Sequence, residues 1–266
     1  MKYFTHKTIW ITGASSGIGR ELAIQLSQFD CTLILSSRRL EALNKVKTLC
    51  NPKCKIYLVT LDLEDHDGLQ ETFDDNRDLL KTVDILINNG GISQRSFAKD
   101  TSFDVYKKLM DVNYLGSVKL TSLLLPYFLE RNAGHFVAVS SSAGKFGVPV
   151  RTGYSASKFA LHGYYEGLRA ELHKTNIHTT LICPGYIKTN ISRNALTADG
   201  SAQGTMDDAQ ANGMPVEIMA SKVLKAISSK KEEYLVGGFK ETHLAVWVSR
   251  IFPSLFRKII AKTRVT

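Results

Sequence analysis

The chain has 266 residues, of which 44% are apolar and 22% are charged, as is typical of a globular protein with a sizeable core. It contains no apolar run of about 18 residues and no secretory signal at its amino terminus, so we expect a cytoplasmic protein without a membrane-spanning helix. The net charge of +9 favours an anionic partner, but no basic stripe interleaved with aromatic residues is present, which argues against nucleic-acid binding.

Four cysteines stand at positions 31, 50, 54 and 183. Cys50 and Cys54 have the spacing of half a metal site, but no second pair of Cys or His residues is suitably placed. We therefore expect free, reduced cysteines and no metal, which agrees with a cytoplasmic protein.

The chain opens with a predicted strand, a glycine-rich turn and a helix. Residues 8–12 have a strand pattern, residues 13–19 read Gly-Ala-Ser-Ser-Gly-Ile-Gly, and helical residues 20–26 follow. Glycine lets the backbone approach a pyrophosphate closely, and a helix amino terminus offers free N–H groups to phosphates. The segment predicts a dinucleotide site, with a plain strand-to-helix turn as the alternative because the spacing is not Gly-x-Gly-x-x-Gly. The candidate cofactor-binding residues here are Gly13, Ser15, Ser16, Gly17, Ile18 and Gly19.

The second predicted strand, residues 32–36, is followed by Ser37, Arg38 and Arg39. In an NAD site, an acidic residue at about this position binds the ribose 2′-hydroxyl. An acid would repel a 2′-phosphate, whereas arginine attracts it and can bond it through two donors. These residues favour NADP(H) over NAD(H), and the alternative is a solvated arginine at the start of a helix over residues 40–49.

Two further predicted strands end in polar residues. Residues 55–61 lead to Asp62 and Leu63, and Asp62 either accepts from an adenine amino group or caps the next helix, expected over residues 68–80. Residues 84–87 lead to an Asn-Asn-Gly-Gly run that contains Asn89 and Gly90 and suits a ligand crevice.

Residues 103–110 and 113–128 read as one long, mostly helical region. Asn113 stands there among apolar neighbours, so its amide must find hydrogen-bond partners. It either bonds the backbone and bends the helix, or it holds a water in a proton relay.

The residues with the strongest chemical signal lie between positions 140 and 158. A strand pattern at residues 136–139 ends in three serines, and residues 154–172 have helical spacing, which places Tyr154 and Lys158 on one helical face. A free tyrosine has a pKa near ~10, and a cation one turn away lowers it. With Ser141 bonding a substrate oxygen, this set suits carbonyl/alcohol interconversion; a solvated or half-buried helix face is the alternative.

The last part of the predicted domain contains a sixth strand at residues 177–182 and the run Cys-Pro-Gly-Tyr-Ile-Lys-Thr at residues 183–189. Residues 190–214 are polar with few large apolar side chains, which predicts a substrate lid. A helix over residues 215–227 and a strand at residues 234–236 complete one domain, residues 1–240, without a dividing linker.

Residues 241–266 are predicted to form a basic amphipathic helical tail. Residues 246–266 include five Lys or Arg and no acidic residue, and Pro253 is expected to start a second helix. The tail either packs on the domain or a partner subunit, or makes a peripheral contact with a membrane surface. Its apolar face consists of Trp247, Val248, Ile251, Phe252, Leu255, Phe256, Ile259 and Ile260.

Taken together, these motifs resemble the short-chain dehydrogenases/reductases from residue 7 to about residue 238. Gly90 is a departure, because the family usually has alanine there. The motifs are Thr12-Gly13-x-x-x-Gly17-Ile18-Gly19, Asp62, Asn88-Asn89-Gly90-Gly91, Asn113, Ser141, Tyr154-x-x-x-Lys158 and Pro184-Gly185-x-Ile187-x-Thr189.

The resemblance implies an α/β fold, a single doubly wound Rossmann domain with a seven-stranded parallel sheet and helices on both faces. It implies Tyr154 as the acid/base, and Lys158 as the modulator of its pKa and a ligand of the nicotinamide ribose. Ser141 would orient the substrate oxygen and Asn113 would hold a relay water. The other implied cofactor contacts are Asp62, Leu63, Asn89 and Gly90 along the adenosine half, and Pro184, Gly185, Ile187 and Thr189 near the nicotinamide.

The expected protein is therefore an NADP(H)-dependent oxidoreductase that acts on a small-molecule carbonyl or secondary alcohol. The tail and the arginine pair resemble the branch with hydroxysteroid and retinol dehydrogenases and the "member 7" subgroup, which implies a bulky apolar substrate. Family habit implies a homodimer or homotetramer through residues 113–128 and 154–172. The alternatives are a 3-oxoacyl thioester reductase, since a charge of +9 would attract an acidic acyl carrier, and a non-catalytic NADP-binding regulator. The presence of Ser141, Tyr154 and Lys158 together argues against the regulator.

Overall fold

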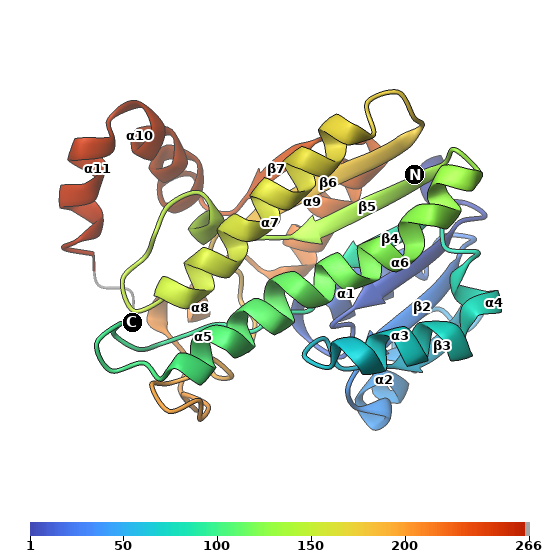
Figure 1. Cartoon of the computed structure of the whole chain (residues 1–266), viewed down its shortest axis with the longest axis horizontal. Coiled ribbons are helices and arrows are strands. Elements are labelled where there is room, and N and C mark those ends of the chain that lie inside the picture. Colours follow the sequence, from blue (N-terminus) through green and yellow to red (C-terminus); the bar gives the residue numbers. More distant parts are fainter. Residues whose placement is uncertain (264–266) are drawn as a thin grey trace.

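Seven parallel strands form the central sheet of the computed structural model, which describes residues 1–263 (Figure 1). Their order across the sheet is β3-β2-β1-β4-β5-β6-β7, which confirms the sheet expected from the sequence. The strands are β1 (Thr8–Thr12), β2 (Thr32–Ser37), β3 (Lys55–Thr60), β4 (Ile85–Asn88), β5 (Gly134–Val139), β6 (Ile177–Pro184) and β7 (Glu233–Val236).

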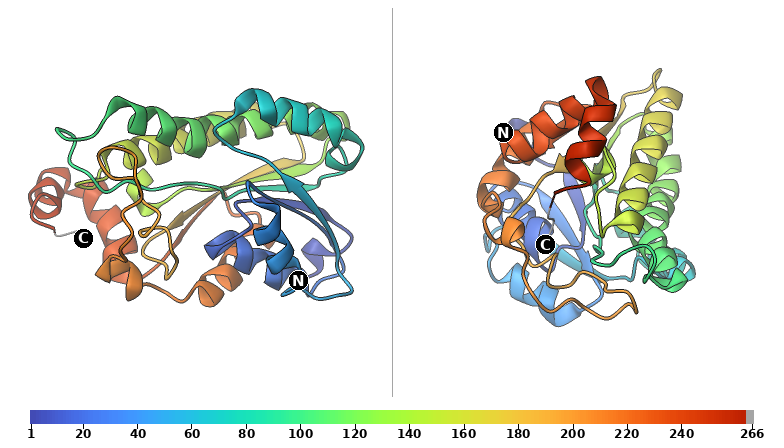
Figure 2. Two further views of the ribbon diagram at one scale, coloured as in Figure 1. Left: turned by 90° about the horizontal axis from the view of Figure 1, so that it is seen from below. Right: turned by 90° about the vertical axis from the view of Figure 1, so that its left-hand side faces the viewer.

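Helices cover both faces of this sheet, as the left view of Figure 2 shows. Parallel neighbours need crossover connections, and in this chain the crossovers are helices. One layer contains α1 (Gly17–Leu26), α2 (Leu40–Lys47) and α9 (Val216–Ser228); the other contains α3 (His66–Asp75), α6 (Gly116–Glu130) and α7 (Thr152–Glu171). The other helical elements are α4 (Arg77–Leu80), α5 (Phe103–Met110), α8 (Asp208–Ala211), α10 (Ala245–Ile251), α11 (Pro253–Ile260) and short 3₁₀ or π turns at Lys2–Phe4, Asp111–Leu115, Ser142–Gly144 and Phe239–Leu244.

The central strands are apolar on both sides because both of their faces are covered. In β1, Ile9 and Ile11 are fully buried in the core that includes α1 and α9. Trp10, between them, points to the opposite core, which includes α6 and α7. This alternation explains why the strands appear in the sequence as continuous apolar runs.

Two predicted helical regions differ in detail from the expectation. The helix expected over residues 68–80 is divided into α3 and α4 at Asn76, whose backbone φ of −111° leaves the helical range and whose side chain bonds the Thr72 carbonyl. The region over residues 103–128 is continuous, but the turn Asp111–Leu115 is π-helical and joins α5 to α6.

The strand order reverses at β1, which pairs with β2 on one side and β4 on the other. The connections that leave β1 and β4 therefore run to opposite faces of the sheet. In open α/β sheets, ligands bind in the crevice that this divergence leaves at the carboxyl ends of the strands. The strand order thus predicts where the functional site lies.

Candidate functional site

A cavity of about 850 Å³ lies at the carboxyl ends of the strands. Residues from the loops after β1 to β6, from the expected lid and from α11 line it. All of the candidate site residues except Gly19 and Asn113 are part of its wall. Those in the wall are Gly13, Ser15, Ser16, Gly17, Ile18, Ser37, Arg38, Arg39, Asp62, Leu63, Asn89, Gly90, Ser141, Tyr154, Lys158, Pro184, Gly185, Ile187 and Thr189.

The glycine turn after β1 needs glycine for two reasons. Gly13 has a φ of +63°, and a Cβ built on it would lie 2.7 Å from the Cα atom of Gly90. Gly19 lies behind the turn, where a Cβ would meet the Gly13 carbonyl oxygen at 2.5 Å. Ser16, the N-cap of α1, makes no side-chain cap hydrogen bond, so the first N–H groups of this helix remain available to an anion.

Asn89 supports the same turn from the end of β4. Its Nδ2 atom donates to the carbonyl oxygen of Thr12 at 3.0 Å, and its backbone N–H donates to the Thr12 hydroxyl at 3.1 Å. Asn89 therefore fixes the shape of the glycine turn while also lining the cavity.

The residues after β2 and β3 form the far end of the cavity. Arg38 and Arg39 are exposed at its rim. Asp62 accepts a hydrogen bond from the Glu64 backbone N–H at 3.1 Å, whereas the cap of α3 is Asp65, which accepts from Gly68. Asp62 is therefore not the cap of this helix, and its contact with adenine stays a prediction.

Ser141, Tyr154 and Lys158 converge at the other end of the cavity. Lys158 follows Tyr154 by one turn of α7, and its Nζ atom is 5.8 Å from the centroid of the tyrosine ring. That Nζ atom also donates to the Val139 carbonyl at 2.9 Å, which ties the lysine to the end of β5. The Ser141 hydroxyl accepts from the Ala143 N–H at 3.1 Å.

The electrostatics of Tyr154 differ from the sequence expectation. Burial raises the pKa of Tyr154 above its ordinary value, and this effect exceeds the lowering by the Ser141 hydrogen bond and by the charges of Arg151 and Arg95. Burial also lowers the pKa of Lys158 to about 8. The net pKa shift of Tyr154 is therefore upward, because desolvation outweighs the groups that favour its phenolate. The lowering by Lys158 that the sequence suggests stays a prediction.

Asn113 lies in the π-helical turn and is buried. Its Oδ1 atom accepts from the backbone N–H of Ile92 at 2.8 Å, while its Nδ2 atom donates to the Ile92 carbonyl and to the Ser157 hydroxyl, each at 2.9 Å. Of the two sequence interpretations, the backbone-bonding one matches these contacts. The relay-water role stays a prediction.

The sequence analysis did not identify some of the residues in and around the cavity wall. Arg95 and Arg151 line the cavity together with Tyr154, and Asp207 of the predicted lid accepts hydrogen bonds from both. Phe256 of the tail also lines the cavity and stacks edge-on against Phe146 at 4.8 Å between ring centroids. Among these residues, only Arg151 could have been suspected from sequence spacing, because it stands three residues before Tyr154.

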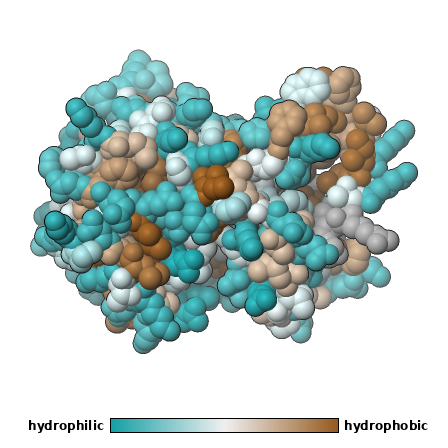
Figure 3. Space-filling view, turned by 180° about the vertical axis from the view of Figure 1, so that it is seen from behind, coloured by the Kyte–Doolittle hydropathy of each residue, from teal (hydrophilic) through white to brown (hydrophobic). Residues whose placement is uncertain are grey.

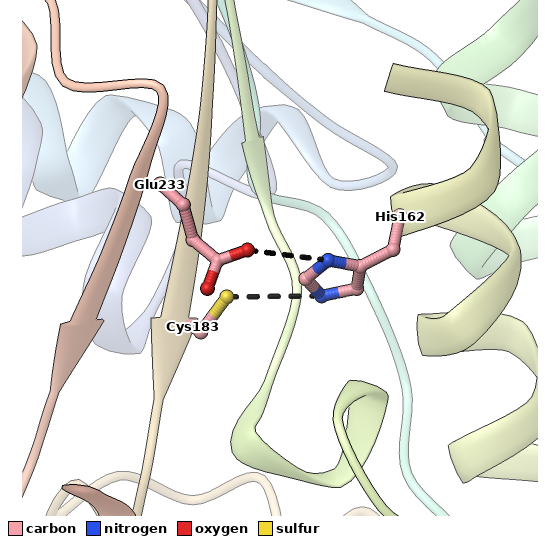
Figure 4. A group of neighbouring side chains, drawn as sticks. All are labelled: His162, Cys183 and Glu233. Carbon is pink, nitrogen blue, oxygen red and sulfur yellow. Dashed lines mark hydrogen bonds and ion pairs between the residues drawn. The ribbon is translucent and has the colours of Figure 1, made fainter. Parts of the chain in front are cut away.

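A cluster of three possible metal ligands lies behind the cavity, where α7 faces β6 and β7 (Figure 4). His162 points between the other two, with Nε2 3.7 Å from the Cys183 sulfur and Nδ1 3.7 Å from a Glu233 oxygen. Ser140 also contacts Nε2 at 3.1 Å, and the ammonium of Lys145 pairs with Glu233.

One charge beside this cluster, the Lys145 ammonium paired with Glu233, disfavours a metal cation. Burial raises the pKa of Cys183, so the thiol stays protonated. Burial and the charge of Lys145 lower the pKa of His162 to about 4, so the imidazole is neutral at pH 7. With Lys145 already paired with Glu233, the contacts of the cluster join α7 to β6 and β7.

Similarity to known proteins extends over nearly the whole chain. Residues 7–200 match the family described as short chain dehydrogenase. The mouse protein "Dehydrogenase/reductase SDR family member 7B" is 39% identical over 264 residues, which are 97% of this chain and 81% of that protein.

Two solved structures share the fold. A short-chain dehydrogenase/reductase from Burkholderia phymatum in complex with NAD has a TM-score of 0.81 at 24% identity, covering 100% of this chain and 98% of that one. A short-chain dehydrogenase from Sphingobium yanoikuyae in complex with NADPH has a TM-score of 0.77 at 21% identity, covering 98% and 97%.

Proposed function

This chain belongs to the short-chain dehydrogenase/reductase family and is an oxidoreductase, and we propose that it interconverts a carbonyl and a secondary alcohol with NADP(H). The observation that carries the proposal is the position of Ser141, Tyr154 and Lys158 in the same cavity as the glycine turn. One end of the cavity suits a dinucleotide, and the other suits proton transfer to a substrate oxygen.

NADPH, when bound, supplies a hydride to the carbonyl carbon of the substrate. In that direction Tyr154 donates its phenolic proton to the substrate oxygen, which becomes the alcohol. Its raised pKa keeps Tyr154 protonated at neutral pH, as a general acid requires. Ser141 donates a hydrogen bond to the same oxygen, and the Lys158 ammonium stabilises the phenolate that remains. Asn113 would hold the water that returns a proton towards Lys158.

The residues at the other end of the cavity fit NADP(H). The free N–H groups at the start of α1 would bond the pyrophosphate. Arg38, supported by Ser37 and Arg39, would bond the 2′-phosphate, because the arginine pair stands where an NAD site has an acid. The other candidate cofactor residues keep the roles that the family resemblance implies.

The substrate proposed for this site is bulky and apolar. Phe146, Val148, Leu196, Phe256 and Ile260 contribute apolar side chains to the part of the wall outside the glycine turn. Of these, Leu196 comes from the predicted lid, residues 190–214, and Phe256 and Ile260 from the predicted tail, residues 241–266. We propose that both segments enclose the substrate.

The other side of the tail is exposed and apolar, and it projects from the body of the molecule at the right of Figure 3. Trp247, Ile251 and Leu255 are 54%, 52% and 53% exposed. The surrounding cations are Arg250, Arg257, Lys258 and Lys262, while Arg264 lies outside the described residues. We propose that this face makes a peripheral contact with an anionic membrane surface, the protein being otherwise cytoplasmic.

Within residues 1–263, none of the helices combines the length and apolar character needed to cross a bilayer. We also propose a homodimer or homotetramer through the outer surfaces of α6 and α7. Phe159 of α7 and Leu115, the residue just before α6, are 45% and 40% exposed. Sedimentation equilibrium would test this, and a monomer at micromolar concentration would contradict it.

The function is tested by fluorescence titration of the full-length protein with NADPH and NADH, followed by NADPH oxidation with a panel of carbonyl compounds. We expect tighter NADPH binding and turnover of bulky apolar ketones. A marked preference for 3-oxoacyl thioesters would favour the acyl-carrier alternative. NADPH binding without turnover of any compound would favour a regulator and contradict the proposal.

A further inference from the structure

The helix that carries Tyr154 is not capped by its own residues. The N-cap position of α7 makes no side-chain cap hydrogen bond, and the first turn contains no acidic residue. The first backbone N–H groups of a helix have no partner within the helix, so they need one from elsewhere when they are buried. Gly153 and Tyr154, which belong to this first turn, are both buried.

Gln94 supplies the acceptor from another part of the chain. Its Oε1 atom accepts from the backbone N–H of Gly153 at 2.8 Å and from that of Tyr154 at 3.3 Å. Both partners can only donate, so the oxygen of the amide and not its nitrogen must face them. The exposed fraction of Gln94 is 0%, so water does not compete for these hydrogen bonds.

The nitrogen of the same amide is held by two hydroxyl groups. Gln94 Nε2 donates to the Ser96 hydroxyl at 3.1 Å and to the Thr101 hydroxyl at 3.2 Å. The two hydroxyl oxygens lie 2.7 Å apart, and Thr101 also donates to the Phe97 carbonyl at 2.8 Å. These contacts fix the orientation of the amide, with its oxygen towards α7.

The backbone at Gln94 is joined to the predicted lid, residues 190–214. Residue 94 forms a parallel β-bridge with Leu196. The Arg95 N–H donates to the Leu196 carbonyl, and the Leu196 N–H donates to the Ser93 carbonyl, each at 2.8 Å. Leu196 is part of the cavity wall, whereas Gln94 is not. Gln94 therefore connects an apolar part of the wall with the turn that carries the catalytic tyrosine.

The first turn of α7 also packs closely against α5. A Cβ atom on Gly153 would lie 2.7 Å from a ring carbon of Tyr106 and 2.9 Å from a methyl carbon of Leu109, which both belong to α5. It would lie 3.2 Å from Oε1 of Gln94. Glycine lets the turn approach both neighbours closely, so α5 and Gln94 together determine where the turn lies.

We propose that Gln94 is a positioning residue that caps the first turn of α7 and so holds the Tyr154 hydroxyl at a fixed place relative to the lid side of the cavity. The proposal rests on the proposed role of Tyr154 as the acid/base. Proton transfer needs donor and acceptor within about 2.6–3.2 Å of each other, so the position of the hydroxyl matters. Because Gln94 does not line the cavity, its effect on the reaction is exerted through Tyr154.

The first measurement follows the surroundings of Tyr154 without substrate or cofactor. The full-length protein is labelled with 3-fluorotyrosine and studied by ¹⁹F NMR, because the fluorine chemical shift depends on the packing around the ring. Among the ten tyrosines, the Tyr154 resonance is the one missing in Tyr154→Phe. The other resonances report whether each variant is folded.

Three variants separate capping from general effects of substitution. Gln94→Met removes the amide at nearly constant side-chain length, and it should shift or broaden the Tyr154 resonance. Gln94→Glu keeps an acceptor at the helix N-terminus, where negative charge is favourable, and should keep the resonance near its wild-type position. The matched control is Gln25→Met, which removes an amide that donates to the Glu217 carbonyl outside the cavity wall; it should leave the resonance unchanged.

The second measurement is turnover of the ketone that the wild type reduces fastest in the carbonyl panel. In Gln94→Met, kcat should fall by roughly 10-fold or more, because misplacing a catalytic group by about 1 Å can cost ~10²-fold. The affinity for NADPH should be nearly unchanged, because Gln94 is not in the cavity wall. Gln94→Glu should recover most of the lost kcat.

An unchanged Tyr154 resonance or an unchanged kcat in folded Gln94→Met would overturn the proposal. Equal changes in Gln94→Met and Gln94→Glu would also overturn it, since the side chain would then act by packing and not as a cap. If Gln94→Met does not fold, Gln94→Asn decides: its amide is one methylene shorter, and an unchanged resonance there contradicts the proposal. A wild type without turnover would refute the proposed function, whereas the NMR test of Gln94 would remain valid.

Discussion

Lys158 lies one helical turn after Tyr154, yet its ammonium points to the end of β5, where it donates to the Val139 carbonyl at 2.9 Å. The ammonium is 5.8 Å from the centroid of the tyrosine ring. It is therefore positioned between the strand end and the phenol, which suits a group that would also bond the ribose of a cofactor.

The first prediction follows from the burial of Lys158, which lowers its pKa to about 8. Above that pH the ammonium loses its proton and its favourable interaction with an anionic cofactor. NADPH affinity, measured by fluorescence titration, should fall as the pH rises through about 8. In Lys158→Met the affinity should be lower throughout and lack this step; parallel pH profiles for the two proteins would contradict the role of Lys158.

The second prediction concerns cofactor choice. Arg38→Asp should weaken NADPH binding much more than NADH binding, because a charge-assisted bond to the 2′-phosphate is replaced by repulsion. Each effect is worth ~1–3 kcal/mol. Lys45→Asp makes the same charge reversal at an exposed position of α2 outside the cavity wall, and it is the neighbouring control. Equal losses for NADPH and NADH in the Arg38 variant would show that Arg38 does not meet the 2′-phosphate.

The third prediction concerns stability against pH. His135 is buried, with Nδ1 2.8 Å from the Tyr3 hydroxyl and Nε2 2.8 Å from the Thr180 hydroxyl. Burial, with smaller effects of His178 and Lys230, lowers its pKa to about 3. The unfolded chain binds this proton near pH ~6.5, so the free energy of unfolding should be highest above that pH and fall as the pH decreases towards about 3.

The slope from this one histidine is at most ~1.4 kcal/mol per pH unit. Urea unfolding of the wild type and of His135→Gln at a series of pH values between neutral and mildly acidic would measure it. The variant should be less stable at neutral pH but lose less stability on acidification. An identical slope in both proteins would show that His135 is not the responsible group.

The fourth prediction separates the two faces of the tail. Replacing Trp247 and Leu255 by serine removes exposed apolar surface but leaves Phe256 in contact with Phe146. The variant should fold and bind NADPH normally, yet sediment much less with vesicles that contain anionic lipid. Vesicles of zwitterionic lipid alone are the control for the electrostatic part. If full-length wild-type protein does not sediment with anionic vesicles, the membrane contact is excluded.

Those parts of the molecule that depend on local spacing could be predicted from the sequence. The glycine turn and the Tyr154–Lys158 pair follow from patterns a few residues long, and the tail helices from their apolar period and Pro253. The contacts of Asp207 with Arg95 and Arg151 could not be predicted, because Arg95 and Asp207 are 112 positions apart and only the fold brings them together.

The burial of the site side chains could not be predicted from the sequence either. The expected effect of Lys158 on Tyr154 assumed a partly solvated pair, whereas both side chains are enclosed by the surrounding elements. The tail illustrates the same point. Its helical period could be predicted from the sequence, but the sequence does not indicate that Phe256 faces the cavity and Trp247 faces solvent. Sequence patterns indicate which residues share a face, and packing decides what that face contacts.

The measurement that tests the central claim most directly is NADPH-dependent carbonyl reduction by Tyr154→Phe beside the wild type. The variant loses only the hydroxyl that donates the proton, so NADPH affinity should be nearly unchanged. Turnover should fall by ~10²–10⁴-fold, the range expected when a general acid is lost. Wild-type turnover in a folded, NADPH-binding Tyr154→Phe protein would contradict the account.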